Sequence, residues 1–270
     1  MKYILTIVSL YFTFLGYSQI VDTGFSLVRT YKGDITGAAI DNLDNLYIIS
    51  STGQVKKFGV NGDSVGVFNG MRKYGKLYNI DVTNPLKPLL FYKDFSDVVV
   101  LDRFLANRVS LNLRQYNILQ PSAIGLSYDN NIWVFDVFDS KLKKIDEAGN
   151  ILLQTDDFRT LFNLSFSPQK IINDNGFVYL ADSAKGIFVF DNYGTFKRKI
   201  ILKDWTTIDV WNGMVVRLNR DAIVVYNPSN FSEKSLQFPT SFTPYIHSFT
   251  TTNKLITFSQ DSLRIYRVGY

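Results

Sequence analysis

Four short β-type runs lie within about 35 residues, from 121 to 155, and this dense alternation constrains the fold more than any other feature. The runs span 123–128, 132–137, 141–145 and 151–153. Asp129, Asn130 and Asn131 separate the first two runs, and such side chains favour turns because they hydrogen-bond nearby backbone. The second run is rich in aromatic and β-branched residues. The third run alternates charged and apolar residues, as a half-exposed strand does. The segment is predicted to form four consecutive antiparallel strands, which make one propeller blade.

The same unit recurs along the chain. Close copies lie at 37–68 and 171–201, and weaker copies lie at 77–113, 205–238 and 245–268. The residues at the centres of the six second runs are Tyr47, Leu90, Trp133, Tyr179, Val216 and Ile256, separated by 43, 43, 46, 37 and 40 residues. A period near ~40 residues is typical of propellers, in which each blade buries its faces against its neighbours.

The last unit contains only three runs, whereas a blade needs four. The N-terminal run 25–31 belongs to no other unit, so it is predicted to supply the outer strand of the last blade. Such closure joins the two ends of the chain and removes an open sheet edge. The predicted fold is therefore all-β, a six-bladed β-propeller of four-stranded antiparallel blades, closed by the N-terminal strand.

Three of the units share a finer pattern. A Gly- or Ala-containing first strand leads into an Asx turn, and a second strand of the form apolar–Tyr/Trp–apolar follows, as in Leu46-Tyr47-Ile48 and Ile132-Trp133-Val134. In these features the units resemble NHL-type repeats. The resemblance implies a propeller, but NHL-like propellers include lyases, lactonases, sensor ectodomains and scaffold modules. It therefore implies no single function.

The first 18 residues are predicted to be a signal peptide. Lys2 supplies a positive start, residues 4–15 form a short apolar core, and Gly16 and Ser18 are small residues placed for cleavage before Gln19. A membrane anchor is the alternative, but spanning a bilayer takes about 20 apolar residues. Residues 19–270 are predicted to form a single propeller domain with no direct insertion into the membrane.

Cysteine is absent, so neither a disulfide nor a thioether-linked lipid anchor can form. Export without disulfides is more typical of bacteria than of eukaryotic secretion, and a propeller's large core needs none. We therefore expect a periplasmic protein, with the cell surface as the alternative. Once Lys2 leaves with the signal peptide, the net charge falls from +5 to about +4. The lysines and arginines are scattered over third and fourth strands, where we expect them to be exposed, so we predict no nucleic-acid partner.

No constellation of residues predicts catalysis. His247 is the only histidine, so a Ser-His-Asp triad would have to use it, and a zinc site lacks the ligands it needs. Calcium is an alternative at the oxygen-rich clusters around Asp41, Asp129 and Asp174, but equivalent hairpin turns favour the same residues. The NHL-like enzymes use His or Glu ligands at the channel mouth, and that pattern is largely missing. We predict no catalytic residue, no metal site and no cofactor.

Two segments interrupt the regular repeat, and both combine large apolar side chains with cations. The first is a Gly-bounded loop with Met71, Arg72 and Tyr74, and the second is an inter-blade segment from 156 to 166. They either pack back on the blades or form a partner surface. The predicted partner-binding residues are Met71, Arg72, Tyr74, Phe158, Leu161, Phe162 and Phe166.

These features predict a non-catalytic exported module that binds an outer-membrane protein or secretion complex. In compartment, size and fold the chain is similar to the soluble subunits that plug outer-membrane translocons, such as that of the type 9 secretion system. One alternative is an NHL-like, metal-dependent hydrolase or lyase acting in the central channel. Another is a carbohydrate-binding propeller that uses Trp133, Trp205 or Trp211 as stacking platforms.

Overall fold

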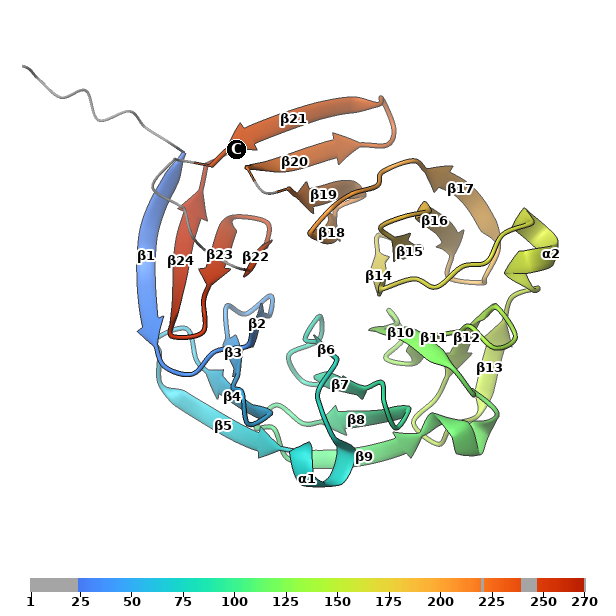
Figure 1. The fold of residues 1–270 in the computed structure, drawn as a ribbon, viewed down its shortest axis with the longest axis horizontal. Helices are drawn as coiled ribbons and strands as arrows, with labels where there is room; N and C mark the ends of the chain where they lie inside the picture. The colour runs from blue at the N-terminus through green and yellow to red at the C-terminus, as the bar shows by residue number, and fades with distance from the viewer. Residues whose placement is uncertain (1–23, 220, 239–246, 270) are drawn as a thin grey trace, which may run out of the picture.

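The computed structural model describes residues 24–219, 221–238 and 247–269, and in these ranges the chain forms six four-stranded antiparallel sheets. The sheets stand around a common centre as the blades of a propeller (Figure 1). The predicted six-bladed, all-β fold is confirmed. The predicted signal peptide, residues 1–18, lies outside the described residues.

Within each of blades 1 to 5 the chain passes from the central strand to the outer strand as an antiparallel meander. Blade 1 holds β2 (Gly37–Ile40), β3 (Leu46–Ile49), β4 (Gln54–Phe58) and β5 (Ser64–Asn69), and blade 2 holds β6 (Asn79–Asp81), β7 (Leu89–Tyr92), β8 (Asp97–Leu101) and β9 (Asn107–Asn112). Blade 3 holds β10 (Pro121–Leu126), β11 (Ile132–Asp136), β12 (Lys141–Ile145) and β13 (Ile151–Gln154), and blade 4 holds β14 (Lys170–Asp174), β15 (Phe177–Asp182), β16 (Gly186–Asp191) and β17 (Phe196–Ile200). Blade 5 holds β18 (Thr207–Trp211), β19 (Met214–Leu218), β20 (Ala222–Asn227) and β21 (Ser232–Gln237), and blade 6 holds β22 (His247–Thr250), β23 (Lys254–Phe258), β24 (Ser262–Val268) and β1 (Phe25–Lys32).

The N-terminal strand closes the ring as predicted. In sheet order, blade 6 reads β22, β23, β24 and β1, so the first described strand is the outer strand of the last blade. β1 pairs antiparallel with β24 from Phe25 opposite Val268 to Lys32 opposite Ser262, with one irregularity between Leu27 and Arg29. The two described ends of the chain therefore meet within one sheet (Figure 1).

The meander gives the propeller two distinct faces. Turns between first and second strands, and between third and fourth strands, lie on one face, which we call the turn face. Turns between second and third strands, and the connections from one blade to the next, lie on the opposite face, which we call the connection face. Three connections contain short helices: α1 (Met71–Tyr74), the 3₁₀ helix η1 (Leu113–Tyr116) and α2 (Phe158–Phe162).

The Asx clusters form hairpin turns, as the sequence predicts. Asp44, Asn130 and Asn175 have φ values of 64°, 63° and 48°, a left-handed conformation that Asp and Asn tolerate better than most residues. In the first of these turns, Asp41 Oδ1 accepts hydrogen bonds from the backbone N–H groups of Leu43 and Asn45 at 3.0 and 2.9 Å. The carboxylate is thus satisfied by its own turn.

The core lies between blades and is built from second and third strands. Between blades 3 and 4 the buried aromatic residues Trp133, Phe135, Phe188 and Phe190 pack with aliphatic neighbours in one cluster. These strands were recognisable from their apolar sequence because both of their faces are covered by other blades. No helix within the described residues is long and apolar enough to span a bilayer.

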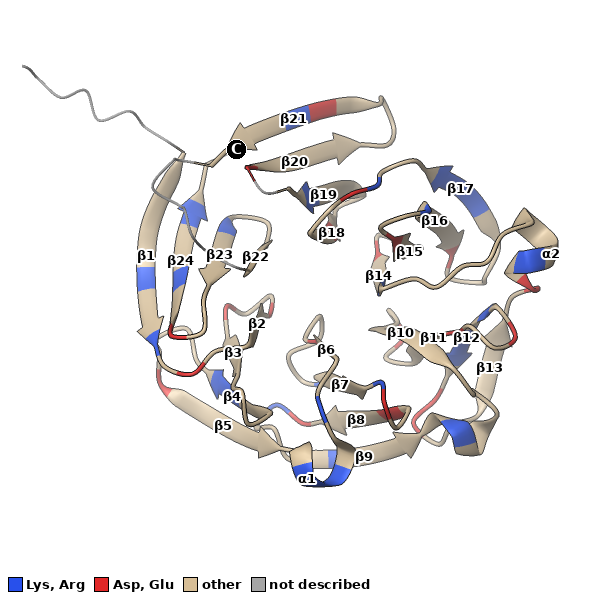
Figure 2. Cartoon of the chain, in the orientation of Figure 1, with Lys and Arg blue, Asp and Glu red and all other residues tan. Residues whose placement is uncertain are grey.

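Several lysines of third strands are buried, and this corrects the expectation that they are exposed. Lys57, Lys143 and Lys144 are each less than a tenth exposed, although cations on the outer strands β1, β17 and β21 do lie on the rim (Figure 2). The ammonium group of Lys143 lies 3.0 Å from Asp136 Oδ2 and 2.7 Å from Asp139 Oδ2. A charge leaves water only where a partner compensates it, and these carboxylates supply that compensation.

Candidate functional site

A central cavity of about 1780 Å³ passes between the blades. Its wall is formed mainly by the first strands of blades 1, 2, 4, 5 and 6, and blade 3 contributes only Ile124. One reason is that Gly125 in β10 lies against the backbone of β14, where an added Cβ would sit 2.7 Å from the carbonyl oxygen of Ile171. Blades 3 and 4 therefore close against each other, and the channel opens toward the other blades.

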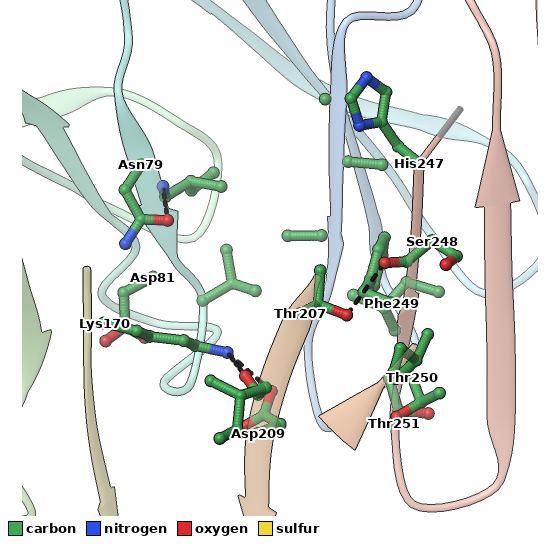
Figure 3. Close-up of a pocket in the computed structure, with 18 of the residues that line it drawn as sticks. Asn79, Asp81, Lys170, Thr207, Asp209, His247, Ser248, Phe249, Thr250 and Thr251 are labelled. Carbon is green, nitrogen blue, oxygen red and sulfur yellow. Dashed lines mark hydrogen bonds and ion pairs between the residues drawn. The ribbon is translucent and has the colours of Figure 1, made fainter. Parts of the chain in front are cut away.

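Many polar groups along the channel hold the blades together. Lys170 Nζ lies 3.0 Å from Asp209 Oδ2 and donates to the carbonyl oxygen of Ile208 at 2.9 Å, linking blades 4 and 5 (Figure 3). Asp81 Oδ2 accepts from the N–H of Leu126 at 2.7 Å, which links blades 2 and 3. Thr207 Oγ1 donates to the carbonyl oxygen of Ser248 at 3.1 Å, which links blades 5 and 6. These side chains therefore have structural partners in neighbouring blades.

His247 lies at the first position of β22, with an exposed side chain at the edge of the cavity (Figure 3). Its ring stacks on Phe258, with centroids 5.1 Å apart and an interplanar angle of 27°. In the described part of the chain, no group of three or more His, Cys, Asp or Glu side chains is placed to hold a metal ion. That His247 takes no part in catalysis stays a prediction.

The three tryptophans proposed as sugar platforms differ in position. Trp133 is fully buried between blades 3 and 4, so its ring is not available to a ligand, and that part of the alternative is corrected. Trp205 and Trp211 line the cavity. Among the described residues that line it, Trp205 Nε1, Asn219 Oδ1 and Thr250 Oγ1 are buried without a hydrogen-bond partner.

The structure buries three of the predicted partner-binding residues. Phe158 and Phe166 are at most 1% exposed and belong to the aromatic core between blades 3 and 4. Tyr74 is 4% exposed, and its hydroxyl lies 2.6 Å from Ser110 Oγ while its ring packs on Tyr92. Aromatic rings on these connections pack back on the blades because that removes their apolar surface from water. These three side chains have no free surface for a partner.

The other predicted residues are partly or fully accessible but do not form one surface. Leu161 is 46% exposed, Arg72 is exposed, and Met71 and Phe162 are half-buried. α1 connects blades 1 and 2, whereas α2 connects blades 3 and 4, and the two helices lie at separate places on the rim (Figure 1). Binding of a partner by these residues stays a prediction.

The turn face carries an apolar feature that was not predicted from the sequence. On three consecutive blades the inner hairpin turn presents one large apolar side chain, and Leu43, Leu86 and Tyr128 are each at least 58% exposed. We call these three residues the apolar arc. Each lies within or at the edge of a polar turn, where a single apolar residue gives little signal. The regular spacing of the turns was the available clue, because equivalent positions in successive blades lie side by side.

The backbone N–H of every residue in the apolar arc donates to an Asp or Asn side chain, which belongs to the same turn for Leu43 and Leu86 and to the next blade for Tyr128. The N–H of Leu43 donates to Asp41 Oδ1 at 3.0 Å, that of Leu86 to Asn84 Oδ1 at 2.9 Å, and that of Tyr128 to Asn173 Oδ1 at 2.7 Å. The turns of blades 2 and 3 are also joined, because Asn84 Nδ2 donates to Asn130 Oδ1 at 2.8 Å. The arc is therefore held rigid before any partner binds.

Asp129 and Lys144 form an ion pair at the inner hairpin turn of blade 3, and this pair makes the stability of the fold depend on pH. Burial alone would raise the pKa of Asp129, but hydrogen bonds from Lys144 and the N–H of Asn131 outweigh it and lower that pKa to about 2. A pKa below the ordinary value of 3.8 means that the ionised carboxylate stabilises the fold above about pH 4. This contribution is lost as the pH falls from about 4 to 2.

We expect Asp129→Asn to lower the melting temperature at pH 6, and we expect the difference from the unsubstituted protein to shrink as the pH approaches 2. Thermal unfolding followed by circular dichroism across this range measures the effect. Asp63→Asn, on an exposed turn with no ion pair in the described structure, is the control. A difference for Asp129→Asn that stays constant from pH 6 to pH 2 would contradict the assignment.

Comparisons with known proteins agree on the fold. No protein-family model and no curated protein sequence matches the chain. Among solved structures, the Pan2 WD40 domain of Neurospora crassa superposes with a TM-score of 0.65 at 12% identity, over 91% of this chain and 96% of that one. Virginiamycin B lyase of Staphylococcus aureus, in a structure with quinupristin, gives 0.59 at 9% identity over 91% and 100% of the two chains. BBS1N, in a structure with ARL6DN, gives 0.59 at 11% identity over 91% and 97%. At these identities the likeness shows the β-propeller fold alone.

Proposed function

We propose that the protein is an exported, non-catalytic module that binds another protein through the apolar arc on its turn face. Its place of action in this proposal is the periplasm. Its partner is an outer-membrane protein complex such as a secretion translocon, which the propeller docks on or plugs. The NHL-like character of three repeat units belongs to the same proposal.

The observation that carries the binding role is the apolar arc itself. Exposed apolar side chains scattered singly over a surface need no explanation, whereas an apolar group on one face favours a protein interface. Leu43, Leu86 and Tyr128 occupy equivalent turns of neighbouring blades, and their backbones are fixed by Asx side chains. Binding to a rigid surface costs less conformational entropy, so more of the interaction energy contributes to affinity.

Two further observations support the finer parts of the proposal. The pattern of residues 1–18 supports export, and the absence of cysteine suits a bacterial compartment in which the fold does not depend on disulfides. Many of the polar groups lining the channel have partners in neighbouring blades, which supports a scaffold role more than a catalytic one. One of the compared structures, BBS1N with ARL6DN, contains a propeller in a protein assembly.

The experiment starts by capturing the partner with the full chain from solubilised membranes, identifying it by mass spectrometry and purifying it. Affinity is then measured for the unsubstituted protein and for Leu43→Ser/Leu86→Ser. We expect the double variant to bind at least about tenfold more weakly, because burying each leucine contributes roughly 1.5–3 kcal/mol. Its melting temperature should stay nearly unchanged, since both side chains are exposed.

A matched double variant on the opposite face provides the control. Phe95→Ser/Phe138→Ser removes two similarly exposed side chains from second-to-third strand turns of blades 2 and 3. We expect it to bind the partner as the unsubstituted protein does. Equal loss in both double variants, or loss only in the control, would place the interface elsewhere than on the turn face. A soluble periplasmic partner would overturn the outer-membrane part of the proposal and leave the turn face as the interface.

A further inference from the structure

Three buried lysines contact the turns that carry the apolar arc. Lys57, Lys87 and Lys144 are each less than a tenth exposed. They come from β4 of blade 1, the inner hairpin turn of blade 2 and β12 of blade 3, which are the three blades that carry the arc. Their ammonium groups bind the turns of Leu86 and Tyr128 directly.

Lys57 joins blade 1 to the turn of Leu86 in blade 2. Its Nζ donates to the carbonyl oxygen of Arg103 at 3.0 Å and to that of Pro85, the residue before Leu86, at 3.5 Å. Within the described residues it forms no ion pair with a carboxylate. Burial lowers the pKa of Lys57, which means that removing this ammonium group from water is unfavourable.

The same lysine reaches the turn of Leu43 through Tyr47. Its ammonium group lies 5.2 Å from the centroid of the Tyr47 ring, and the hydroxyl of Tyr47 donates to Asp41 Oδ2 at 3.0 Å. The other oxygen of this carboxylate accepts from the N–H of Leu43. A line of contacts therefore runs from the turn of Leu43 through Lys57 to the turn of Leu86.

Lys87 joins the turn of Leu86 to both hairpin turns of blade 3. Its ammonium group lies 2.7 Å from Glu147 Oε1, in the turn between the third and fourth strands. It also donates to the carbonyl oxygen of Asn130, in the turn of Tyr128. The residue that follows one member of the arc thus holds the turn of the next member.

Lys144 holds Tyr128 from within blade 3. Its Nζ lies 2.9 Å from Asp129 Oδ2 and 5.6 Å from the centroid of the Tyr128 ring. A cation within about 6 Å of a ring centroid is attracted to the ring. Lys144 therefore contacts an arc residue and the residue after it.

The propeller fold itself does not require a lysine at the strand positions of Lys57 and Lys144. Each of these lysines pairs with the central residue of its second strand. The equivalent positions of the other four blades hold Val99, Val189, Val225 and Ile265. A buried ion pair can often be replaced by apolar residues of similar volume without loss of stability. The two lysines occur in blades of the arc, whereas the inner turns of blades 4, 5 and 6 present no exposed large apolar side chain.

We propose that Lys57, Lys87 and Lys144 are positioning residues of the partner-binding surface. They fix the three turns relative to one another, so that the apolar arc stands as one preformed surface. In some proteins buried charged groups fix geometry instead of adding stability, and a preformed surface loses less conformational entropy on binding. This inference rests on the proposed function for its partner, but the fixing of the turns is measurable on the free protein.

The first measurement uses the full chain without a partner. Lys57→Met, Lys87→Met and Lys144→Met each remove an ammonium group and keep most of the side-chain volume. Hydrogen–deuterium exchange is followed by mass spectrometry on peptides that cover the three turns of the arc. We expect exchange at least about tenfold faster in the turns that the lost ammonium group contacted. A variant that does not fold is replaced by the glutamine variant at the same position.

The second measurement is affinity for the purified partner that the full chain captures. Each methionine variant should bind at least about tenfold more weakly per folded molecule. Lys170→Met is the matched control, because Lys170 also makes an ion pair and a bond to a carbonyl oxygen between neighbouring blades, but in blades 4 and 5. It should leave both the affinity and the exchange of the arc turns unchanged.

The two measurements separate this proposal from the proposed function. Unchanged exchange at the arc turns would overturn the positioning role whatever the partner does. Faster exchange with unchanged affinity, while Leu43→Ser/Leu86→Ser weakens binding, would overturn it too, because the arc would then not need fixed turns. An equal effect of Lys170→Met on the arc turns would show a general loosening of the propeller instead. If neither the serine nor the methionine variants weaken binding, the proposed function fails, and exchange in the free protein alone decides whether the lysines position the turns.

Discussion

Phe158→Ala is expected to lower the free energy of unfolding by about 3–5 kcal/mol, the range for removing a large aromatic side chain from a packed core. Phe158 is fully buried, and its ring centroid lies 5.0 Å from that of Phe135, 5.2 Å from Phe190 and 5.4 Å from Phe166. Alanine would leave a cavity in the core between blade 3 and blade 4. Because α2 ties the two blades together through this side chain, relaxation should recover only part of the loss. Urea denaturation at equilibrium measures the change.

The matched control lies three residues along the same helix. Leu161 is 46% exposed, and Leu161→Ala should cost less than about 1 kcal/mol. The comparison decides between the two interpretations of the segment from 156 to 166. Near-equal stability of both variants would mean that Phe158 does not fill the core and that a docking role for it must be considered again.

The same packing changes what is expected of Phe162. If Phe162 served only as an interface anchor, its replacement would not lower the stability of the fold. Its ring centroid, however, lies 4.8 Å from that of Phe196 and 5.0 Å from that of Phe188. Such edge-to-face pairs stabilise the fold beyond the area that they bury. Replacement of Phe162 therefore perturbs the outer part of blade 4, and any effect on a partner has to be measured per folded molecule.

The architecture was predictable because the signals that specify it are local. Tyr47, Trp133 and Tyr179 each occupy a second strand, as expected, since a strand buried on both faces reads as an apolar run. The turns were predictable because left-handed positions select Asp, Asn and Gly. Closure by β1 followed from counting strands: five units held four runs and the last held three.

Burial of charged side chains was not predictable in this way. Lys143 alternates with apolar residues in sequence, a pattern that usually marks a solvated face. The structure places it between Asp136 from the same blade and the carbonyl oxygen of Asn117 from the preceding connection. A charged residue is buried only where distant segments bring a partner, and a period of two along one strand carries no information about those segments.

The candidate surface was missed for a related reason. Phe158 and Phe166 are clustered in the sequence because they fill the core, so their clustering does not indicate an interface. Leu43, Leu86 and Tyr128 stand alone in sequence, and only the ring of blades places them on neighbouring turns. Interaction surfaces on a propeller are assembled across blades, while repeat patterns describe one blade at a time.

Deletion of residues 19–32 is expected to destabilise the fold strongly, because β1 joins three blades. It pairs with β24 at seven positions, and each lost backbone hydrogen bond costs about 0.5–1.5 kcal/mol. Arg29 also donates to the carbonyl oxygen of Val60 at 3.1 Å, and Tyr31 packs on Phe58, which ties β1 to blade 1. Phe25 lies 6.0 Å from Phe238, at the end of blade 5.

We expect this deletion to lower the melting temperature by roughly 10 °C or more, since ~1 kcal/mol corresponds to ~2–4 °C for a chain of this size. Deletion of residues 19–23 alone, which leaves β1 complete, is the control and should melt like the mature chain. Loss of β1 also exposes the edge of β24, so the shortened protein should self-associate in sedimentation experiments. A shortened protein that stays monomeric and melts with the control would show that blades 1 to 5 and the remaining three strands hold the ring closed without β1.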